Sequence, residues 1–537
     1  MRHRGEFRAG VRAAALALTV PAVIAGSVSP AAARPSGTTA ATGTPTAAAA
    51  ADGTLVVTAT DRQGGPVTIR TVSVTDEATQ RQIVVTTGDR VALAPGRYEV
   101  AADIQEENGA DTLAGRVVAV TAGATTAVDF DARQGRAVSV QVDRPFDDGY
   151  PQRLTARICS DGHPAHIGAT NDPGNLYVIP DPGGSTELGY LSTWTGLEND
   201  SVWKAAGTGP LDDHPGGTVA RASFGAVPVQ VRRGPALDRY SALDVVPDDA
   251  GCDRWASTGG RFTTEPYASA YHLTPGAWNW TFGAGTTNFL ADQTVVPGDN
   301  PGQLYNRAVW GPVRYLPWVQ QGKLGFFTSG LFADPVLDGL ETSINASATL
   351  YRGSTAVAST SGLGNWGPGI VRTFWGPVTR SAWYTLKVHA TRHVPGLETD
   401  PNRLSSAVDV SFRFHAGPTS KAVAPGFLTR FEPAGLDLYN RTPATGASIA
   451  LTLDRTGTQP GVPRWPSTAK KVEVFASADG GRSWQPLAVT HTGGAWTAHL
   501  PAQRPGASLS LSSRVTDTGG NQTVSTVYRA FTVVPAS

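Results

Sequence analysis

Apolar and polar residues alternate with a period of two along much of the chain, and residues 53–135 show the pattern most clearly. Such alternation is typical of half-buried strands. Turn-forming clusters at residues 61–65 and 87–89 separate the apolar runs. The runs occupy residues 55–57, 69–74, 83–85, 91–93, 98–100, 117–120 and 126–130. They predict a small β-sandwich of about seven strands.

The turn at residues 93–100 has the strongest local signal in this segment. Pro95 presets φ for a turn, and we expect Gly96 to supply a positive φ. Tyr98 and Val100 should then lie on one face of a new strand.

Two further β regions follow. Residues 136–418 contain strand-like runs at 346–351, 384–388 and 408–414, which predict one or two larger sandwiches with a seam near residue 245. A boundary at residues 417–420 precedes a last Ig-like sandwich at 419–537. No apolar period of 3.6 persists over three turns. The predicted fold class is therefore all-β, with tandem β-sandwich domains of Ig-like or prealbumin-like type.

The N-terminus has the layout of a secretory signal peptide. Four arginines precede an apolar stretch at residues 13–25, and three alanines follow at 31–33. The alternative, a membrane anchor, needs about 20 apolar residues, and Pro21 interrupts this shorter stretch. The sequence predicts a signal peptide at 1–33, a flexible Ala/Thr-rich linker at 34–52 and a secreted, extracellular product.

The balance of charged residues argues against nucleic acid and anionic membranes as partners. The 44 basic residues balance the 44 acidic ones, so no electrostatic footprint for nucleic acid or for an anionic membrane is present. An extracellular protein or a polysaccharide remains as the expected partner.

Cys159 and Cys252 are the two cysteines. In an exported protein they predict one disulfide, which would stabilise the fold by roughly 4–5 kcal/mol in the chain-entropy model. Two isolated thiols are the alternative.

A hairpin turn at residues 477–484 fits the Asp-box pattern of sialidase-type hairpins. Asp479 can accept backbone N–H bonds while glycines take the special dihedrals, and Trp484 packs beneath. We expect Ser477, Asp479, Gly481 and Trp484 to be a structural device.

Metal and cofactor sites are weakly indicated. The spacing of Cys159, Asp161, His163 and His166 matches no common zinc pattern. His389 and His393 would lie about 13 Å apart on a strand. Acidic pairs at 212–213 and 248–249 could hold a structural calcium, although solvated turns are the simpler interpretation. No cofactor is expected.

Catalytic motifs of the common hydrolases and nucleotide-binding enzymes do not occur. One open alternative is a hydrolase with a site not visible in sequence, in which His163, His166 or His272 acts as the base. A second is a carbohydrate-binding module that stacks sugar rings on Trp278, Trp280, Trp310 and Trp318. Burial of these indoles in sandwich cores is the competing interpretation.

The order of β segments resembles the C-terminal accessory region of large secreted bacterial subtilisin-like serine peptidases. Residues 93–100 are similar to the Pro-Gly-x-Tyr-x-Val segment of their first post-catalytic domain, and residues 126–133 to the strand that follows it. Residues 408–414 resemble a strand closing their middle region, while residues 474–484 and 513–524 resemble their terminal domain.

The catalytic motifs of that family have no counterpart here. Gly-His-Gly-Thr-His and Gly-Thr-Ser-Met-Ala are absent, and Asp-Thr-Gly occurs at 517–519 inside the expected terminal turn. The resemblance implies a secreted, non-catalytic β-domain protein that binds an extracellular polymer, a protein or a partner peptidase.

Overall fold

The structure is a computed structural model that describes residues 51–146, 150–160, 167–196, 201–234, 241–248, 261–263, 265–284, 287–335, 340–341, 343–366, 372–392, 403–455 and 461–536. The predicted signal peptide and all but the end of the predicted linker lie outside these residues. In the described ranges, no helix is long and apolar enough to cross a membrane.

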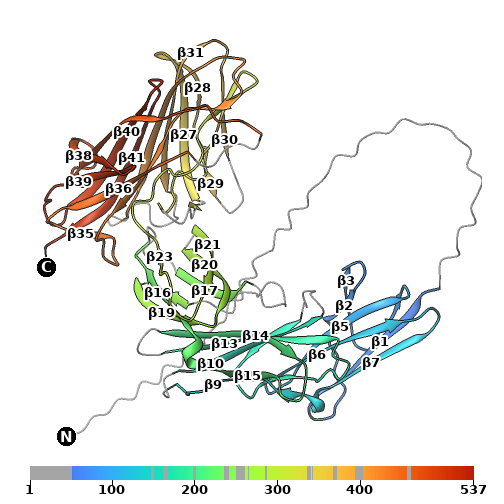
Figure 1. Cartoon of the computed structure of the whole chain (residues 1–537). Coiled ribbons are helices and arrows are strands. Elements are labelled where there is room, and N and C mark those ends of the chain that lie inside the picture. Colours follow the sequence, from blue (N-terminus) through green and yellow to red (C-terminus); the bar gives the residue numbers. More distant parts are fainter. Residues whose placement is uncertain are drawn as a thin grey trace, which may run out of the picture. The chain divides into compact units, whose positions relative to one another are not determined.

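The protein is all-β, as the alternation predicts. Apart from two short 3-10 turns, η1 (Ala132–Gln134) and η2 (Arg221–Ser223), the regular elements of the described residues are strands. They form tandem β-sandwiches (Figure 1). The fold class expected from the sequence is confirmed.

The first segment contains the seven predicted strands in two sheets. One sheet has the order β4 (Arg90–Leu93), β1 (Gly53–Thr60), β7 (Thr125–Asp131). The other has the order β3 (Gln82–Val85), β2 (Val72–Asp76), β5 (Gly96–Gln105), β6 (Asp111–Val120), β12 (Leu176–Val178), β8 (Arg136–Ala137). Because β12 pairs with β6, this second sheet extends beyond the expected boundary at residue 135.

The turn before β5 differs from the expectation in one respect. Gly96 does not adopt a positive φ, and it is the first residue of β5. Tyr98 and Val100 do share the buried face, and the Tyr98 hydroxyl donates to the Ala94 carbonyl at 2.9 Å. That bond to a backbone carbonyl four residues upstream resembles the tyrosine corner of Ig-like domains.

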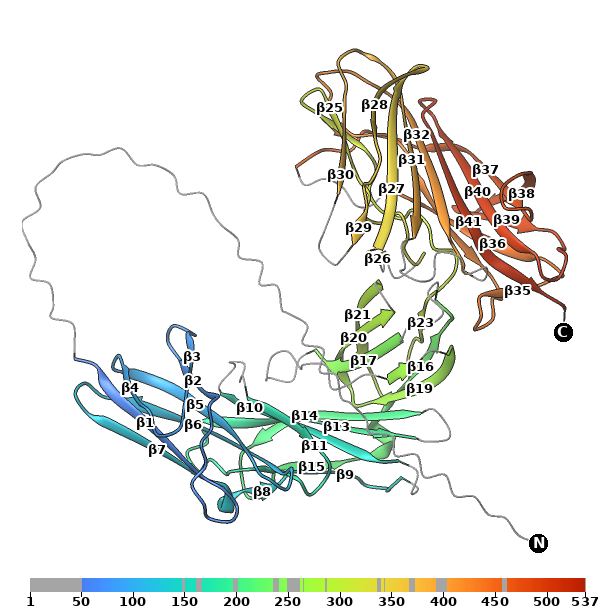
Figure 2. The same cartoon turned by 180° about the vertical axis from the view of Figure 1, so that it is seen from behind.

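The next segment forms three sheets around two cores. An eight-stranded sheet has the order β11 (Gly168–Asn171), β10 (Gln152–Ser160), β13 (Thr186–Thr195), β14 (Val202–Pro210), β19 (Tyr267–Leu273), β16 (Gly225–Val231), β22 (Gly298–Asp299), with β23 (Gln303–Tyr305) also on β16. A two-stranded sheet pairs β15 (Gly216–Val219) with β9 (Ser139–Val142). A five-stranded sheet has the order β18 (Arg261–Thr263), β17 (Ser241–Pro247), β20 (Gly276–Ala284), β21 (Thr287–Val295), β26 (Leu340–Glu341) (Figure 2).

The predicted seam near residue 245 is wrong. Val245 is fully buried within β17, which pairs on both sides. The Val-Val-Pro sequence that suggested a linker instead supplies a core strand. The two clusters meet at residues 305–310, where Tyr305 and Trp310 belong to one core and Ala308 and Val309 to the next.

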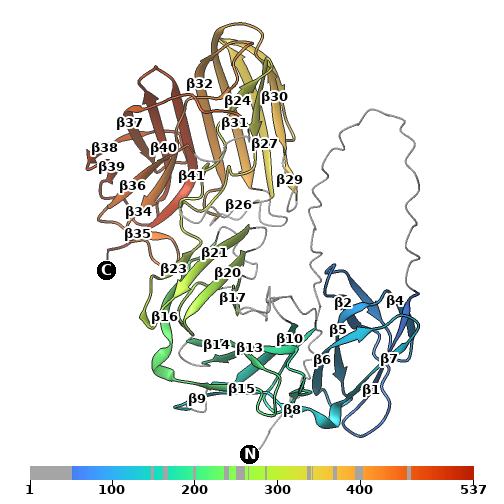
Figure 3. The same cartoon turned by 45° about the vertical axis from the view of Figure 1, so that its right-hand side comes forward.

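The last segment has one four-stranded and one thirteen-stranded sheet (Figure 3). The smaller has the order β30 (Thr373–Pro377), β25 (Lys323–Phe327), β24 (Trp318–Gln320), β33 (Ala422–Val423). The larger has the order β28 (Thr355–Thr360), β27 (Ser343–Arg352), β31 (Ala382–Arg392), β32 (Ala407–Ala416), β41 (Gln522–Val534), β40 (Ser508–Asp517), β37 (Ala469–Ser477), β38 (Gln485–Thr492), β39 (Ala495–Leu500), β36 (Ala447–Asp454), β34 (Leu428–Pro433). Two further strands join it, β29 (Asn365–Trp366) on β27 and β35 (Arg441–Pro443) on β41.

Pairing between β32 and β41 crosses the boundary expected at residues 418–419. Their register runs from Ala407 opposite Tyr528 to Arg413 opposite Gln522. A single core cluster accordingly contains buried residues from Ala308 to Val533, including Phe412 and Phe531. The middle and C-terminal regions therefore meet edge to edge over one continuous core.

A large-to-small substitution should reveal this shared core. Phe412 is 1% exposed, so Phe412→Ala should lower the free energy of unfolding by about 3–5 kcal/mol. In hydrogen exchange, amides of both β31 and β37 should lose protection, because the two strands belong to one cooperative unit. Phe130→Ala, in the separate core of the first segment, is the matched control and should leave both strands protected. Loss confined to residues 343–416 would show two independent cores.

Candidate functional site

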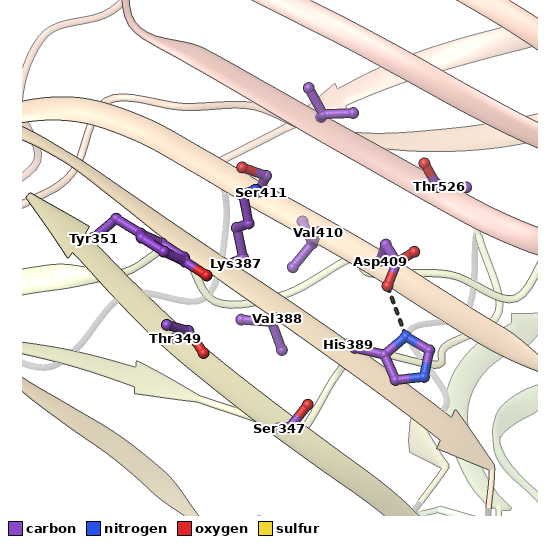
Figure 4. A pocket seen from close by; sticks show the side chains of 11 residues that line it. Ser347, Thr349, Tyr351, Lys387, Val388, His389, Asp409, Val410, Ser411 and Thr526 are labelled. Atoms are coloured by element: carbon purple, nitrogen blue, oxygen red, sulfur yellow. Dashed lines mark hydrogen bonds and ion pairs between the residues drawn. The ribbon is translucent and has the colours of Figure 1, made fainter. Parts of the chain in front are cut away.

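A groove of about 400 Å³ lies on the outer face of β27, β31, β32 and β41 (Figure 4). Alternate residues of each strand point to this face, while their neighbours belong to the core. On β31, for example, Lys387 and His389 are exposed, whereas Leu386 and Val388 are buried. Hydroxyl-bearing side chains dominate the rest of the lining.

The strand register places chemically complementary side chains in rows across the groove. Ser347 on β27 lies opposite His389 on β31, and His389 lies opposite Asp409 on β32. Asp409 in turn lies opposite Thr526 on β41. Side chains opposite one another in a sheet have Cβ atoms about 4.5–5.5 Å apart, close enough to interact.

Asp409 connects two of the groups at this site by hydrogen bonds. The His389 Nδ1–H donates to Asp409 Oδ1 at 2.7 Å, and the Tyr528 hydroxyl donates to Asp409 Oδ2 at 2.7 Å. The carboxylate thus fixes the imidazole with Nδ1 turned inward, which leaves Nε2 for a ligand. We refer to His389, Asp409 and Tyr528 as the relay.

The relay shifts the pKa of each member. The hydrogen bond to Asp409 raises the pKa of His389 above its ordinary value, with burial opposing the shift. Burial alone would raise the pKa of Asp409, but the hydrogen bonds from His389 and Tyr528 outweigh it and lower that pKa. Burial and the bond to Asp409 raise the pKa of Tyr528 to about 12. The contact therefore favours the protonated form of His389 and the ionised form of Asp409, relative to the same groups in water.

The Asp-box turn lies next to Tyr528. Asp479 accepts backbone N–H bonds from Arg482 at 3.0 Å and Ser483 at 2.9 Å, and its pKa is lowered, chiefly by the hydrogen bond from the Ser483 hydroxyl. Gly481 has a φ of +89°, and a Cβ there would meet the Tyr528 ring at 2.7 Å.

Those contacts make the Asp box a support for the relay. Ser477 Oγ donates to Asp479, and Trp484 is half-buried beside Gly481. The residues expected to form a structural device have that geometry, and the device also holds one wall of the relay in place.

A second contact orders Lys387. Its Nζ lies 5.4 Å from the centre of the Tyr351 ring, within the range of cation–π attraction. Figure 4 shows the two side chains together at one end of the groove. The contact positions the ammonium without neutralising it.

Ser347, His389 and Asp409 are the residue types of a hydrolase triad, but their arrangement lacks two requirements. In the described part of the chain, no hydrogen bond joins Ser347 to His389. Backbone N–H groups of β31 are committed to ladders on both sides, so they do not form an oxyanion hole.

The four tryptophans that could have stacked on sugar rings are buried, so that alternative is wrong and the competing interpretation, burial in sandwich cores, is confirmed. Trp278, Trp280, Trp310 and Trp318 are 1%, 0%, 2% and 3% exposed. Their indoles fill sandwich interiors: Trp278 Nε1 donates to the Thr274 carbonyl, and Trp318 covers Gly325. Among the large hydrophobic side chains that the structure describes, the exposed tryptophan is Trp375, at 54%.

The other candidate residues do not assemble into a site. His272 stacks on Trp203 at 3.8 Å, and burial followed by the charge of Arg221 lowers its pKa. Asp213 is 3.0 Å from Arg136, and Asp212 caps a turn. Residues 161–166, which include His163 and His166, lie outside the described residues, as do Asp249 and His393. Within the described ranges, no group of three His, Cys, Asp or Glu residues is placed to hold a metal ion.

Cys159 is buried at the end of β10. Cys252 lies outside the described residues, so the disulfide between them stays a prediction. None of the cysteines that the structure describes is free.

The pKa of His389 offers a direct test of the relay. In an NMR titration it should lie above the ordinary imidazole value, and Asp409→Asn should lower it by removing the negative partner. Because the folded-state pKa is raised, the pairing stabilises the fold fully below the unfolded pKa of about 6.5 and is lost as pH rises through the folded pKa. Tyr528→Phe keeps the carboxylate and should keep the His389 pKa raised. An unchanged titration in Asp409→Asn would contradict the relay.

Comparisons with known proteins identify no family. No family model matches, and no curated protein matches.

Solved structures match only weakly. The Bacillus anthracis TIE protein is 10% identical over 48% of this chain and 51% of that protein, with a TM-score of 0.13. A streptococcal ancillary pilin is 11% identical over 47% of this chain and 98% of that chain, with a TM-score of 0.12. Chicken CNTN1 FN1-FN3 domains are 9% identical over 57% of this chain and 99% of that chain, with a TM-score of 0.14. This chain thus covers about half of the TIE protein.

Proposed function

We propose that this chain is a secreted, non-catalytic binding protein whose groove on β27, β31, β32 and β41 takes a hydroxyl-rich polysaccharide. The observation that carries the proposal is the lining. Hydroxyl, imidazole, ammonium and carboxylate groups share one face with a single tyrosine ring. Export and the relation to peptidase accessory regions are further parts of the proposal, supported by the N-terminal sequence and the resemblance described above.

The composition of the groove favours a sugar over a protein surface. Protein interfaces depend on a few apolar or aromatic anchors in dry pockets. Here Val388 and Val410 belong to the core beneath the groove, and Val524 is a half-buried apolar side chain of the lining. Ser347, Thr349 and Ser411 instead offer donors and acceptors that match a ring with several hydroxyls.

The position of the groove suits a polymer. Because it lies on the outer face of a sheet, a chain longer than the groove can continue across neighbouring strands. Its volume falls within the range of about 300–1,000 Å³ typical of small-ligand sites, so one or a few sugar units would be held directly.

Hydrolysis is the second candidate, because one register row contains Ser347, His389 and Asp409. It requires Ser347 as the nucleophile. If purified protein hydrolyses ester, peptide or glycan substrates and Ser347→Ala abolishes that activity, the chain is an enzyme and the binding proposal is wrong in its non-catalytic part.

Removal of the groove's aromatic ring tests the proposed function. In affinity electrophoresis against a panel of soluble polysaccharides, Tyr351→Ala should weaken binding about tenfold by removing the ring that a sugar contacts. Trp375→Ala is the matched control, since that indole is exposed outside the groove. A circular-dichroism melt checks that both variants fold. Loss of binding in Trp375→Ala alone would place the site elsewhere.

A further inference from the structure

Two basic side chains from the same strand line the groove. Lys387 and His389 are alternate residues of β31, so they share a face and are about 7 Å apart along the strand. Arg413 lies two residues beyond Ser411 on β32 and adds a positive charge to the same face of the sheet. Its guanidinium lies 4.1 Å from the Trp383 ring centre.

Lys387 keeps its charge available. The ion pairs of the described residues do not include it, and its contact with the Tyr351 ring is an attraction to an uncharged group. On the strands that flank it, the opposing residues are Thr349 and Ser411, which carry no charge.

Asp409 is the carboxylate in the groove lining, and both of its oxygens already accept hydrogen bonds. One oxygen accepts from His389 and the other from Tyr528. When His389 is protonated, the pair with Asp409 is neutral overall, and Lys387 leaves a net positive charge. Around His389, the facing groups are Ser347 on β27, Asp409 on β32, and Thr526 and Tyr528 on β41.

We infer that the ligand of the groove is an acidic polysaccharide whose carboxylate lies between Lys387 Nζ and His389 Nε2, an assignment that rests on the proposed function. Both groups are donors, and hydrogen bonds between charged partners are roughly twice as strong as neutral ones. The hydroxyls of Ser347 and Ser411 lie on either side of this pair and would contact the sugar ring. A neutral sugar would leave the ammonium without a counter-charge.

Binding should also depend on pH. Asp409 favours the protonated imidazole, so affinity for the acidic polymer should be highest below the pKa of His389 and fall as pH rises through it. Part of the affinity should persist at higher pH, because the amino group of Lys387 offers the ligand a second contact in the groove lining that does not depend on the imidazole.

The test compares one polymer with and without its charge. Full-length mature protein is titrated near 0.15 M salt, where nonspecific attraction is screened, with polygalacturonate and with its methyl ester, which has the same backbone. At about pH 5.5 the acid should bind about tenfold more tightly than the ester, by the added charge-assisted bonds. Lys387→Met should lower this preference to about threefold, because the imidazole of His389 still faces the carboxylate.

Controls separate the groove from general surface charge. Lys323→Met removes an exposed lysine on β25, outside the groove, and should leave the preference intact. His389→Asn should abolish the pH dependence between about pH 5.5 and pH 8 while keeping part of the preference for the acid.

Each outcome decides a different claim. Equal binding of acid and ester that is lost in Tyr351→Ala would overturn the anionic ligand and leave the groove as a polysaccharide site. Tighter binding of polyglutamate than of either polymer would assign the groove to an acidic peptide and overturn the inference. No binding to any polysaccharide in the panel would overturn both the inference and the proposed function.

Discussion

Edge pairing between β32 and β41 is the constraint on which the site depends. It joins segments separated by more than a hundred residues, and it brings Asp409 next to Thr526 and within hydrogen-bond distance of Tyr528. The pairing also removes an open edge from both regions, which would otherwise present unpaired N–H and C=O groups. Without it, the groove would lose the wall formed by β41, and the relay would lose its tyrosine. Fold stability and site geometry therefore rest on the same ladder.

The two faces of this sheet have separate tasks. Inward residues such as Val410 and Phe412 build the core, so the outward positions are free to carry any residue that tolerates water. Ordering side chains on a solvated face costs conformational entropy, about 1–2 kcal/mol for the longer ones. The relay nevertheless fixes His389 through Asp409 and Tyr528, and Lys387 lies over Tyr351. Exposed pairs of this kind contribute little to stability, so the order of these side chains is not explained by stability alone.

The period-two alternation in the sequence was sufficient to predict the strands but not to predict which residues form the groove. The first seven strands follow from local alternation, because the side-chain period of two is a property of each strand alone. The expectation for Gly96 and the seam near Val245 failed, since Pro-Gly and Val-Pro pairs occur both in turns or linkers and at strand ends. Burial of Trp278 and Trp280 depends on packing that no local pattern contains. Ser347, Lys387, Asp409 and Tyr528 were missed because register between distant strands decides which side chains meet. The polar alternation over residues 383–391 and 407–415 was the one signal that could have marked them.

The Asp box shows why a structural motif and a site need not be independent. Its hydrogen bonds are local, running from Ser477 to Ser483, and they would form the same turn on any hairpin. On this hairpin the turn places Gly481 against the Tyr528 ring, where no larger residue fits without displacement. Tyr528 is followed by Arg529 at a φ of +57°, near a shift of register between β40 and β41. A bulge of this kind re-aims side chains. The turn and the bulge position Tyr528, which donates to Asp409, and Asp409 in turn accepts from His389. A local folding signal at one end of the sheet is thereby connected to the imidazole in the groove.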